Sequence, residues 1–279
     1  MPGLVPHRPL LAVMMLALIV AEFLWRRRSG RYDLRDAAAS LGVALGQVAL
    51  RPVTLILLLA VLAPLRKLAP LSLPVDDWRT WVAAFFAVDF TYYWFHRASH
   101  RIRWLWATHA VHHSSRQMVL PAAIRLGWTA FFSLGWLFFA ALILMGFPPL
   151  IVGAMLATNL LYQFPLHSEA IGRLGPLEAM FNTPSHHRAH HSRDAPYLDC
   201  NFGGILILWD RMFGTFRAEP RDGGLRYGLA DGDAGSNPFR IALGEWARLF
   251  RAMRAAGSFG GAMAVALSKP GSDSAVDAS

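Results

Sequence analysis

Histidines arranged in three short motifs are the part of this sequence with the clearest chemical potential. Ten of the 11 histidines lie between residues 96 and 191, and eight of them form H-x-x-x-H at 96–100 and H-x-x-H-H at 109–113 and 187–191. Residues three and four apart share one face of an α-helix, so each motif directs two or three imidazoles the same way. Neutral imidazole is a ligand for iron, zinc and copper. Because eight to ten nitrogen donors exceed what one ion can take, the spacing predicts two metal ions.

The residues around the histidines narrow the chemistry that such a site could perform. The zinc-protease motif needs a glutamate directly after its first histidine, and here that position is Arg97. A metal pair held by neutral ligands keeps a high positive charge, which favours binding and reduction of O₂ when electrons arrive. The single cysteine, Cys200, excludes an intrachain disulfide framework and a cysteine-ligated iron–sulfur cluster. The electrons must therefore come from another protein.

Long apolar runs must position these motifs. Hydrophobic residues make up 54% of the chain and charged residues only 16%, against about 25% charged in a soluble domain. Each run approaches the ~20 residues that cross a bilayer core. The sequence therefore predicts an all-α fold: an integral membrane helical bundle of four or five membrane helices with a histidine-rich helical cap. The runs are residues 9–25, 37–65 (broken near Arg51 and Pro52 by a kink or into two interfacial halves), 78–95, and a hairpin of 127–146 and 149–166.

The basic residues predict the orientation of these spans. An arginine cluster at 26–35 follows the first span, and cytoplasmic loops carry an excess of Lys and Arg. Two further crossings return the chain to the cytoplasm at residue 96, and the hairpin leaves and returns before residue 167. All three motifs then face the cytoplasm, at an inner or plasma membrane. A substrate that reaches them from the bilayer would be a lipid.

The remaining charge and the C-terminal region predict further features. The net charge is +9, but the arginines flank apolar spans and no basic aromatic platform appears, so no nucleic-acid partner is expected. Residues 219–238 predict a loop, and 268–279 a disordered tail. Between them, 241–253 forms an apolar helical stripe that could lie on the membrane surface or pack against the catalytic region. The predicted domains are 1–80 (membrane helices), 81–218 (catalytic) and 219–279 (C-terminal).

The motifs and their flanks resemble a known family. They are D-F-T-Y-Y-W-F-H-R-A-S-H at 89–100, L-W-A-T-H-A-V-H-H-S-S at 105–115, N-T-P-S-H-H-R-A-H-H at 182–191, D-C-N-F-G-G at 199–204 and W-D-R-M-F-G-T-F at 209–216. This stretch resembles the fatty acid hydroxylase and sterol desaturase superfamily of integral-membrane di-iron oxygenases. It is most similar to the sterol desaturase and alkylglycerol monooxygenase branch. The resemblance implies two iron ions, O₂ and an external electron donor such as a ferredoxin or a cytochrome b5-like protein.

The resemblance also implies the residues of the site, with no catalytic side chain beyond the metal centre. Some members carry an additional H-x-x-x-H, of which this chain has His167 but Gln163 in the first position, so His167 is an expected ligand and Gln163 is not. His186 should face away from the metals, as an outer neighbour of the ligands or at most a marginal ligand, because one residue rotates a helix by about 100°. Carboxylates and amides could hold the ligating imidazoles, and the candidates are Asp89, Asp199, Asn201, Asp210 and Glu169, although Asp199 and Asp210 could equally cap helices or turns. The implied iron ligands are His96, His100, His109, His112, His113, His167, His187, His190 and His191.

These expectations together predict an O₂-dependent lipid hydroxylase or desaturase. The alternative within enzymes is an ether-lipid monooxygenase of the alkylglycerol type. The alternatives of other classes are a non-catalytic membrane metal-binding or transport protein and a zinc-loaded structural protein. The lipid substrate, the choice between hydroxylation and desaturation, and the oligomeric state stay open.

Overall fold

The computed structural model describes residues 8–30 and 32–271, and within these ranges the chain is helical with only isolated β-bridges. Short 3-10 helices occur at Arg27–Ser29, Phe164–Leu166, Gly175–Ala179 and Ala195–Tyr197. The α-helices are α1 (Arg8–Arg26), α2 (Leu34–Lys67), α3 (Trp78–Arg101), α4 (Arg103–His113), α5 (Leu120–Ala123), α6 (Trp136–Leu144), α7 (Pro149–Gln163), α8 (Pro184–His191), α9 (Leu208–Met212), α10 (Pro238–Ala255) and α11 (Phe259–Leu267). The all-α prediction is confirmed for these residues.

Polar side chains determine where four of these helices begin. Asp33, Asp77, Asn237 and Ser258 precede α2, α3, α10 and α11, and each accepts a hydrogen bond from a backbone amide of the first turn. Such caps satisfy N–H groups that have no partner inside the helix. They fix the entry points of the helices that surround the histidines.

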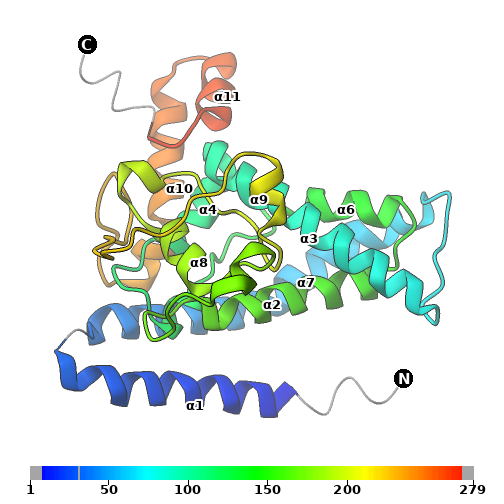
Figure 1. Ribbon diagram of the computed structural model, residues 1–279. Helices are drawn as coiled ribbons and strands as arrows, with labels where there is room; N and C mark the ends of the chain where they lie inside the picture. Colours follow the sequence, from blue (N-terminus) through cyan, green and yellow to red (C-terminus); the bar gives the residue numbers. More distant parts are fainter. Residues whose placement is uncertain (1–7, 31, 272–279) are drawn as a thin grey trace.

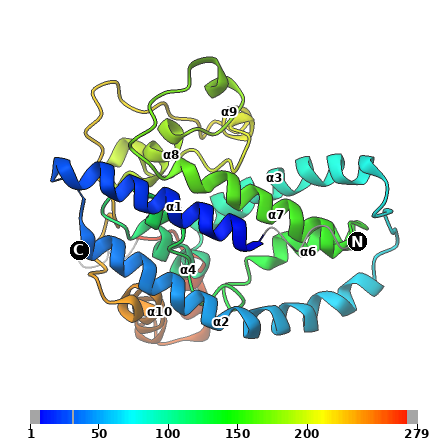
Figure 2. The ribbon, with the colours of Figure 1, turned by 90° about the horizontal axis from the view of Figure 1, so that it is seen from below.

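The long helices α1, α2, α3 and α7 run along one common direction, and the 68–77 connection lies at the opposite end from α4 and α8 (Figures 1 and 2). At that far end the backbone N–H of Leu73 donates to the carbonyl of Gly146 at 3.0 Å. Gly146 has a φ of +102°, and a Cβ there would lie 2.9 Å from the Leu71 carbonyl oxygen, so only glycine suits this turn. The α2–α3 connection and the α6–α7 connection therefore pack against each other at this end of the bundle.

Two helical segments are long and apolar enough to cross a membrane, Leu34–Lys67 and Pro149–Leu166. Helix α2 continues without interruption through Pro52, so of the two alternatives for this break the division into two interfacial halves is wrong. The predicted 127–146 span is also wrong in extent, because α6 covers only 9 residues. At 1.5 Å per residue such a helix is far shorter than the ~30 Å bilayer core. Gly127 packs against Thr108, and turns occupy most of 128–134.

The apolar core of the bundle lies between α3, α6 and α7. Its buried members include Val88, Phe139, Ile143 and Ile151. Helix α1 is attached to the rest by its polar residues: Glu22 accepts from the Leu120 amide at 2.7 Å, and Arg26 donates to the Met118 carbonyl at 2.9 Å. This packing holds the segment that follows the second histidine motif.

The C-terminal region packs against the histidine-bearing end. Ile241, Trp246 and Leu249 of α10 are buried, and α10 contacts α4, α2 and α11. Packing on the catalytic region, one of the two alternatives for 241–253, is therefore confirmed. The predicted disordered tail begins too early, since the Ser268 carbonyl accepts from the Arg103 amide at 2.9 Å. Residues 272–279 of that tail lie outside the described residues.

Candidate metal centre

The histidines converge into two groups at one end of the bundle. In each group the potential ligand atoms all lie within 4.8 Å of one another. We name them the first and second histidine clusters. The first contains His96, His100, His109, His113 and His190, and the second contains His112, His167, His187 and His191. The nine residues expected as ligands are the members of these clusters, and His186 belongs to neither.

Helix geometry explains why single motifs divide between the clusters. On α4, His109 and His113 are four residues apart and join the first cluster, whereas His112 joins the second. On α8, His187 joins the second cluster and His190 the first. Adjacent helical residues point about 100° apart, so one short helix can serve two sites. The clusters touch, since the rings of His113 and His191 stack with centroids 4.3 Å apart.

Backbone carbonyls orient three of the imidazoles. The Nδ1 atoms of His96, His167 and His190 lie 2.9, 2.9 and 2.7 Å from the carbonyl oxygens of Phe202, Gln163 and Cys200. A carbonyl can only accept, so each Nδ1 carries the proton and each Nε2 presents a lone pair. This tautomer is the one that directs Nε2 to a metal.

The Nε2 atoms then face one another at the distances that a shared ion would require. His96 and His109 are 3.0 Å apart at Nε2, and His167 lies 3.1 Å from His112 and 3.0 Å from His187. Two ligand nitrogens each about 2.1 Å from one ion, at right angles, lie about 3 Å apart. The Nε2 atom of His190 is buried and has no hydrogen-bond partner among the described residues. The donors therefore fit metal ions in both clusters.

Burial keeps the clusters neutral at physiological pH. It lowers the pKa of His109, His113 and His190 well below the ordinary 6.5, and neighbouring imidazoles add to the shift. The pKa of His167 falls to about 4 through burial, against the opposing effect of its backbone hydrogen bonds. A metal-binding imidazole must be unprotonated, so the folded chain presents these ligands ready to bind.

The carboxylates Asp89 and Asp210 hold a loop instead of the imidazoles. Asp210 accepts from the amides of Phe202 and Gly203 at 2.7 Å each. Asp89 accepts from the Ile205 and Leu206 amides, the Trp209 indole and the Asn159 side chain. Backbone amides occupy their oxygens, and neither carboxylate forms a hydrogen bond with a cluster histidine among the described residues; for Asp210 this matches the alternative of a role in a turn. They act through the loop, which carries the carbonyl that contacts His96.

Asp199 is the carboxylate that approaches a cluster directly. Its Oδ1 lies 3.7 Å from His100 Nδ1, and its Oδ2 lies 2.7 Å from Lys269 Nζ and 3.4 Å from Arg101 Nε. Burial alone would raise the pKa of Asp199, but the neighbouring His100 imidazole and Lys269 ammonium lower it to about 2. Asp199 is thus an anion beside the first cluster. A pocket of about 400 Å³ opens there, lined in part by His100, His190, Asp199 and Lys269.

The other expected neighbours have structural partners. Asn201 donates to the carbonyls of His186 and Arg217 at 3.0 and 2.7 Å. His186 Nε2 lies 3.9 Å from the Glu178 carboxylate, and its ring packs on Phe216. Glu169 pairs with Arg26 at 2.6 Å. The Gln163 side chain accepts from Tyr92 and donates to Asn159. None of these contacts involves a member of either cluster.

Sequence reasoning missed a buried ion pair behind the second motif. Arg125 is fully buried and donates to Asp36 Oδ1 at 2.8 Å, while Ser115 donates to Asp36 Oδ2 at 2.6 Å. Ser115 closes the H-H-S-S segment, and Asp36 lies in the first turn of α2, so the group joins the end of α4 to α2. The only available signal was an aspartate at the start of an apolar run.

We expect Lys269→Ala to weaken metal binding by the first cluster while leaving the fold intact. Without the ammonium, Asp199 loses its shortest ion pair and holds His100 less firmly. Loss of an outer partner of a metal ligand typically lowers metal affinity about 10- to 100-fold, and we expect the lower end because Lys269 acts through Asp199. Competition with an iron chelator measures the effect. Lys269→Arg should restore most of the affinity; equal affinities of all three proteins would contradict the role.

Comparisons of the sequence with known proteins give a matching family and several relatives. The fatty acid hydroxylase family matches residues 81–215. The chain is 41% identical over 211 residues to alkylglycerol monooxygenase from Homo sapiens, covering 75% of this chain and 46% of that protein. It is 51% identical over 149 residues to alkylglycerol monooxygenase from Danio rerio, covering 53% of this chain and 33% of that protein.

A bacterial relative extends the comparison. The chain is 32% identical over 144 residues to an ornithine lipid hydroxylase from Rhizobium tropici, covering 50% of this chain and 43% of that protein. The chain thus spans less than half the length of each of these three relatives. No solved structure gives a significant match. The family match, these identities and the two histidine clusters together show that the chain belongs to the fatty acid hydroxylase and sterol desaturase superfamily.

Proposed function

We propose that this protein catalyses the O₂-dependent hydroxylation of a membrane lipid with two iron ions, one in each histidine cluster. The observation that carries the proposal is the convergence of buried, neutral Nε2 atoms in two adjacent groups. Iron bound there and reduced by an external donor would supply the activation of O₂ for insertion into a C–H bond. The names of the relatives, monooxygenases and hydroxylases, favour this reaction over desaturation.

The residues of this chain would contribute binding, orientation and exclusion of water. The carbonyls of Phe202, Gln163 and Cys200 fix the tautomers of His96, His167 and His190, so the ligands need no reorganisation when iron binds. Burial limits the access of water to the ligands, and the pocket lined by His100 and His190 is an open approach to the first cluster. No acid–base side chain is needed for the attack on an unactivated C–H bond, because the metal centre carries the difficult step.

The substrate class that the comparisons favour is an ether lipid, since the relatives at 41% and 51% identity are named alkylglycerol monooxygenases. One oxygen atom of O₂ would enter the C–H bond beside the ether oxygen. The other would leave as water with two electrons and two protons. The resulting hemiacetal would break its C–O bond into an aldehyde and a free alcohol. The electrons would come from a ferredoxin or a cytochrome b5-like protein.

The test is lipid mass spectrometry with the purified full-length protein, ferrous iron, a ferredoxin reducing system and O₂. An alkylglycerol, a diacyl lipid and a sterol are offered separately. We expect aldehyde and glycerol from the alkylglycerol, and no product from a His187→Ala variant. Addition of one oxygen atom to another lipid would correct the substrate alone. Loss of two hydrogen atoms would replace hydroxylation by desaturation, and O₂ uptake with no lipid product would sink the proposal.

We further propose that the histidine end faces the cytoplasm of an inner or plasma membrane. Arg26 and its neighbours in the α1–α2 connection support this, because Arg26 contacts Met118 and Glu169 at the histidine end. A reporter inserted after Arg35 should respond as cytoplasmic, and one in the 68–77 connection as external. The reverse pattern would turn the clusters to the outside.

A further inference from the structure

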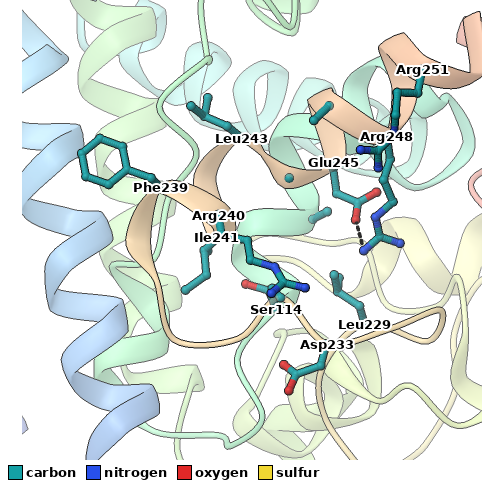
Figure 3. Close-up of a pocket in the computed structure, with 14 residues that line it drawn as sticks. Ser114, Leu229, Asp233, Phe239, Arg240, Ile241, Leu243, Glu245, Arg248 and Arg251 are labelled. Atoms are coloured by element: carbon teal, nitrogen blue, oxygen red, sulfur yellow. Dashed lines mark ion pairs between the residues drawn. The ribbon is translucent and has the colours of Figure 1, made fainter.

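A second pocket lies behind the second histidine motif, on a face of α4 that the clusters do not use. It has a volume of about 520 Å³ and lies between α10, the end of α4 and the 229–234 loop. Figure 3 shows Arg240 reaching from α10 toward Ser114, and Arg248 paired with Glu245. Ala110 and Ser114 line the pocket, whereas His109 and His113 face the first cluster. The pocket is thus separate from the metal centre.

Two of the three arginines in this pocket form no ion pair with another described residue. Arg248 lies 2.7 Å from Glu245 and 3.5 Å from Asp231, so its charge is balanced. Asp233 is engaged by Arg116 at 3.4 Å. Arg240 and Arg251 have no ion-pair partner among residues 8–30 and 32–271. The pocket is lined by three arginines and two carboxylates, Asp233 and Glu245, so its lining carries an excess of one positive charge. Guanidinium groups match the geometry of a phosphate.

The same helix presents an apolar stripe beside these arginines. Phe239, Leu243 and Phe250 are 66%, 43% and 51% exposed. Their spacings of four and seven residues place them on one line of the helix. A helix with exposed apolar residues beside arginines is the type that lies in a membrane interface and attracts anionic lipid. If the partner were a soluble protein, there would be no reason for this stripe to lie beside a bilayer.

The pocket also adjoins helix α2, whose exposed apolar surface is suited to face lipid. Pro238, the first residue of α10, packs against Gly42 of α2, and the ring of Phe239 lies 5.1 Å from that of Trp128. One turn further along α2, Leu45 is 72% exposed. Helix α2 is one of the two segments suited to cross a membrane. A lipid lying against α2 could therefore bring its headgroup to the arginines.

We propose that this pocket binds the phosphate headgroup of an anionic phospholipid, with the acyl chains lying along Phe239, Leu243 and α2. The lipid is not the substrate, because α4 separates it from the metal centre. Its binding joins the C-terminal helix and the second histidine motif to the membrane surface. The proposal does not depend on the catalytic function.

The test measures lipid binding by the full-length protein in a neutral detergent. Phosphatidylglycerol, phosphatidylcholine or inorganic phosphate is titrated, and binding is read from the thermal midpoint and from native mass spectrometry. We expect phosphatidylglycerol alone to raise the midpoint of the wild type. Each basic residue near a lipid surface contributes roughly fivefold to affinity, so Arg240→Gln with Arg251→Gln should lower the affinity about 25-fold.

The control removes the same charge elsewhere, by Arg35→Gln with Arg221→Gln, two exposed arginines outside the pocket. It should bind phosphatidylglycerol like the wild type, and Arg240→Lys with Arg251→Lys should retain most of the affinity. Because Arg240 and Arg251 are exposed, neither pair of glutamines should change the midpoint without lipid. Equal losses in the two glutamine pairs would reduce the site to non-specific attraction. An equal response to phosphatidylcholine or to inorganic phosphate would overturn the phospholipid assignment. The absence of a response to any lipid would also overturn it and would favour an acidic protein as the partner.

Discussion

Replacing His167 or His190 with Ala is expected to remove one iron each and to abolish turnover in both variants. His167 lies in the second cluster and His190 in the first, so each substitution deprives a different ion of a ligand. Iron content should fall from about two to about one per chain. Metal analysis of the purified variants gives the number. Because the rings of His113 and His191 stack between the clusters, a smaller loss of the second iron is also expected.

The control for this pair is His186→Ala, which removes a buried histidine beside the third motif without touching either cluster. His186 contacts Glu178 and Phe216, so its loss should cost stability but leave both irons in place. The ligand assignment would be wrong if His186→Ala lost both irons while His167→Ala kept them. Gln163→Ala should resemble His186→Ala, because the Gln163 side chain bonds to Tyr92 and Asn159, and its backbone carbonyl still serves His167.

The second large effect is expected at Asp210, which forms no hydrogen bond with a histidine of either cluster among the described residues. Asp210→Ala would leave the buried amides of Phe202 and Gly203 and the hydroxyl of Thr215 without their acceptor. Each unsatisfied buried group costs about 1–3 kcal/mol, so the loss of an acceptor for these three groups should lower the free energy of unfolding by at least about 3 kcal/mol. The Phe202 carbonyl would also move from His96, and the first cluster should lose iron before the second.

Thermal denaturation in detergent, followed together with iron release, measures this effect. Asp210→Asn should be intermediate, because an amide keeps one acceptor oxygen and places an NH₂ group against an amide donor. The matched control is Asp222→Ala, which removes an exposed carboxylate from the loop before α10 and should change little. If Asp210→Ala melted and held iron as the control does, the loop would not position His96.

Local patterns were enough to predict the helices that bear histidines and the residues that converge. Spacings of three and four determine which side chains share a helix face, so the nine cluster members followed from the motifs and from the family resemblance. Apolar runs likewise located α1, α2, α3 and α7. The prediction of a membrane span at 127–146 was wrong in extent, because hydropathy does not report the turns that Gly127 and Ser133 favour.

Several features depended on contacts between distant segments. The division of each H-x-x-H-H motif between two clusters follows from where α3 and the segment after α7 approach α4 and α8, which no local pattern records. The carbonyls of Phe202 and Cys200 hold imidazoles, yet every residue has a carbonyl, so no residue type marks them. The roles of Asp89 and Asp210 depended on the loop at 202–206. This loop follows Asp89 by more than 100 residues in the chain, whereas it lies only a few residues before Asp210. The sequence by itself determined the donors and their helix faces, because those depend on neighbours along the chain. Only the tertiary structure decided which donors share an ion and which groups orient them, because those depend on packing between helices far apart in sequence.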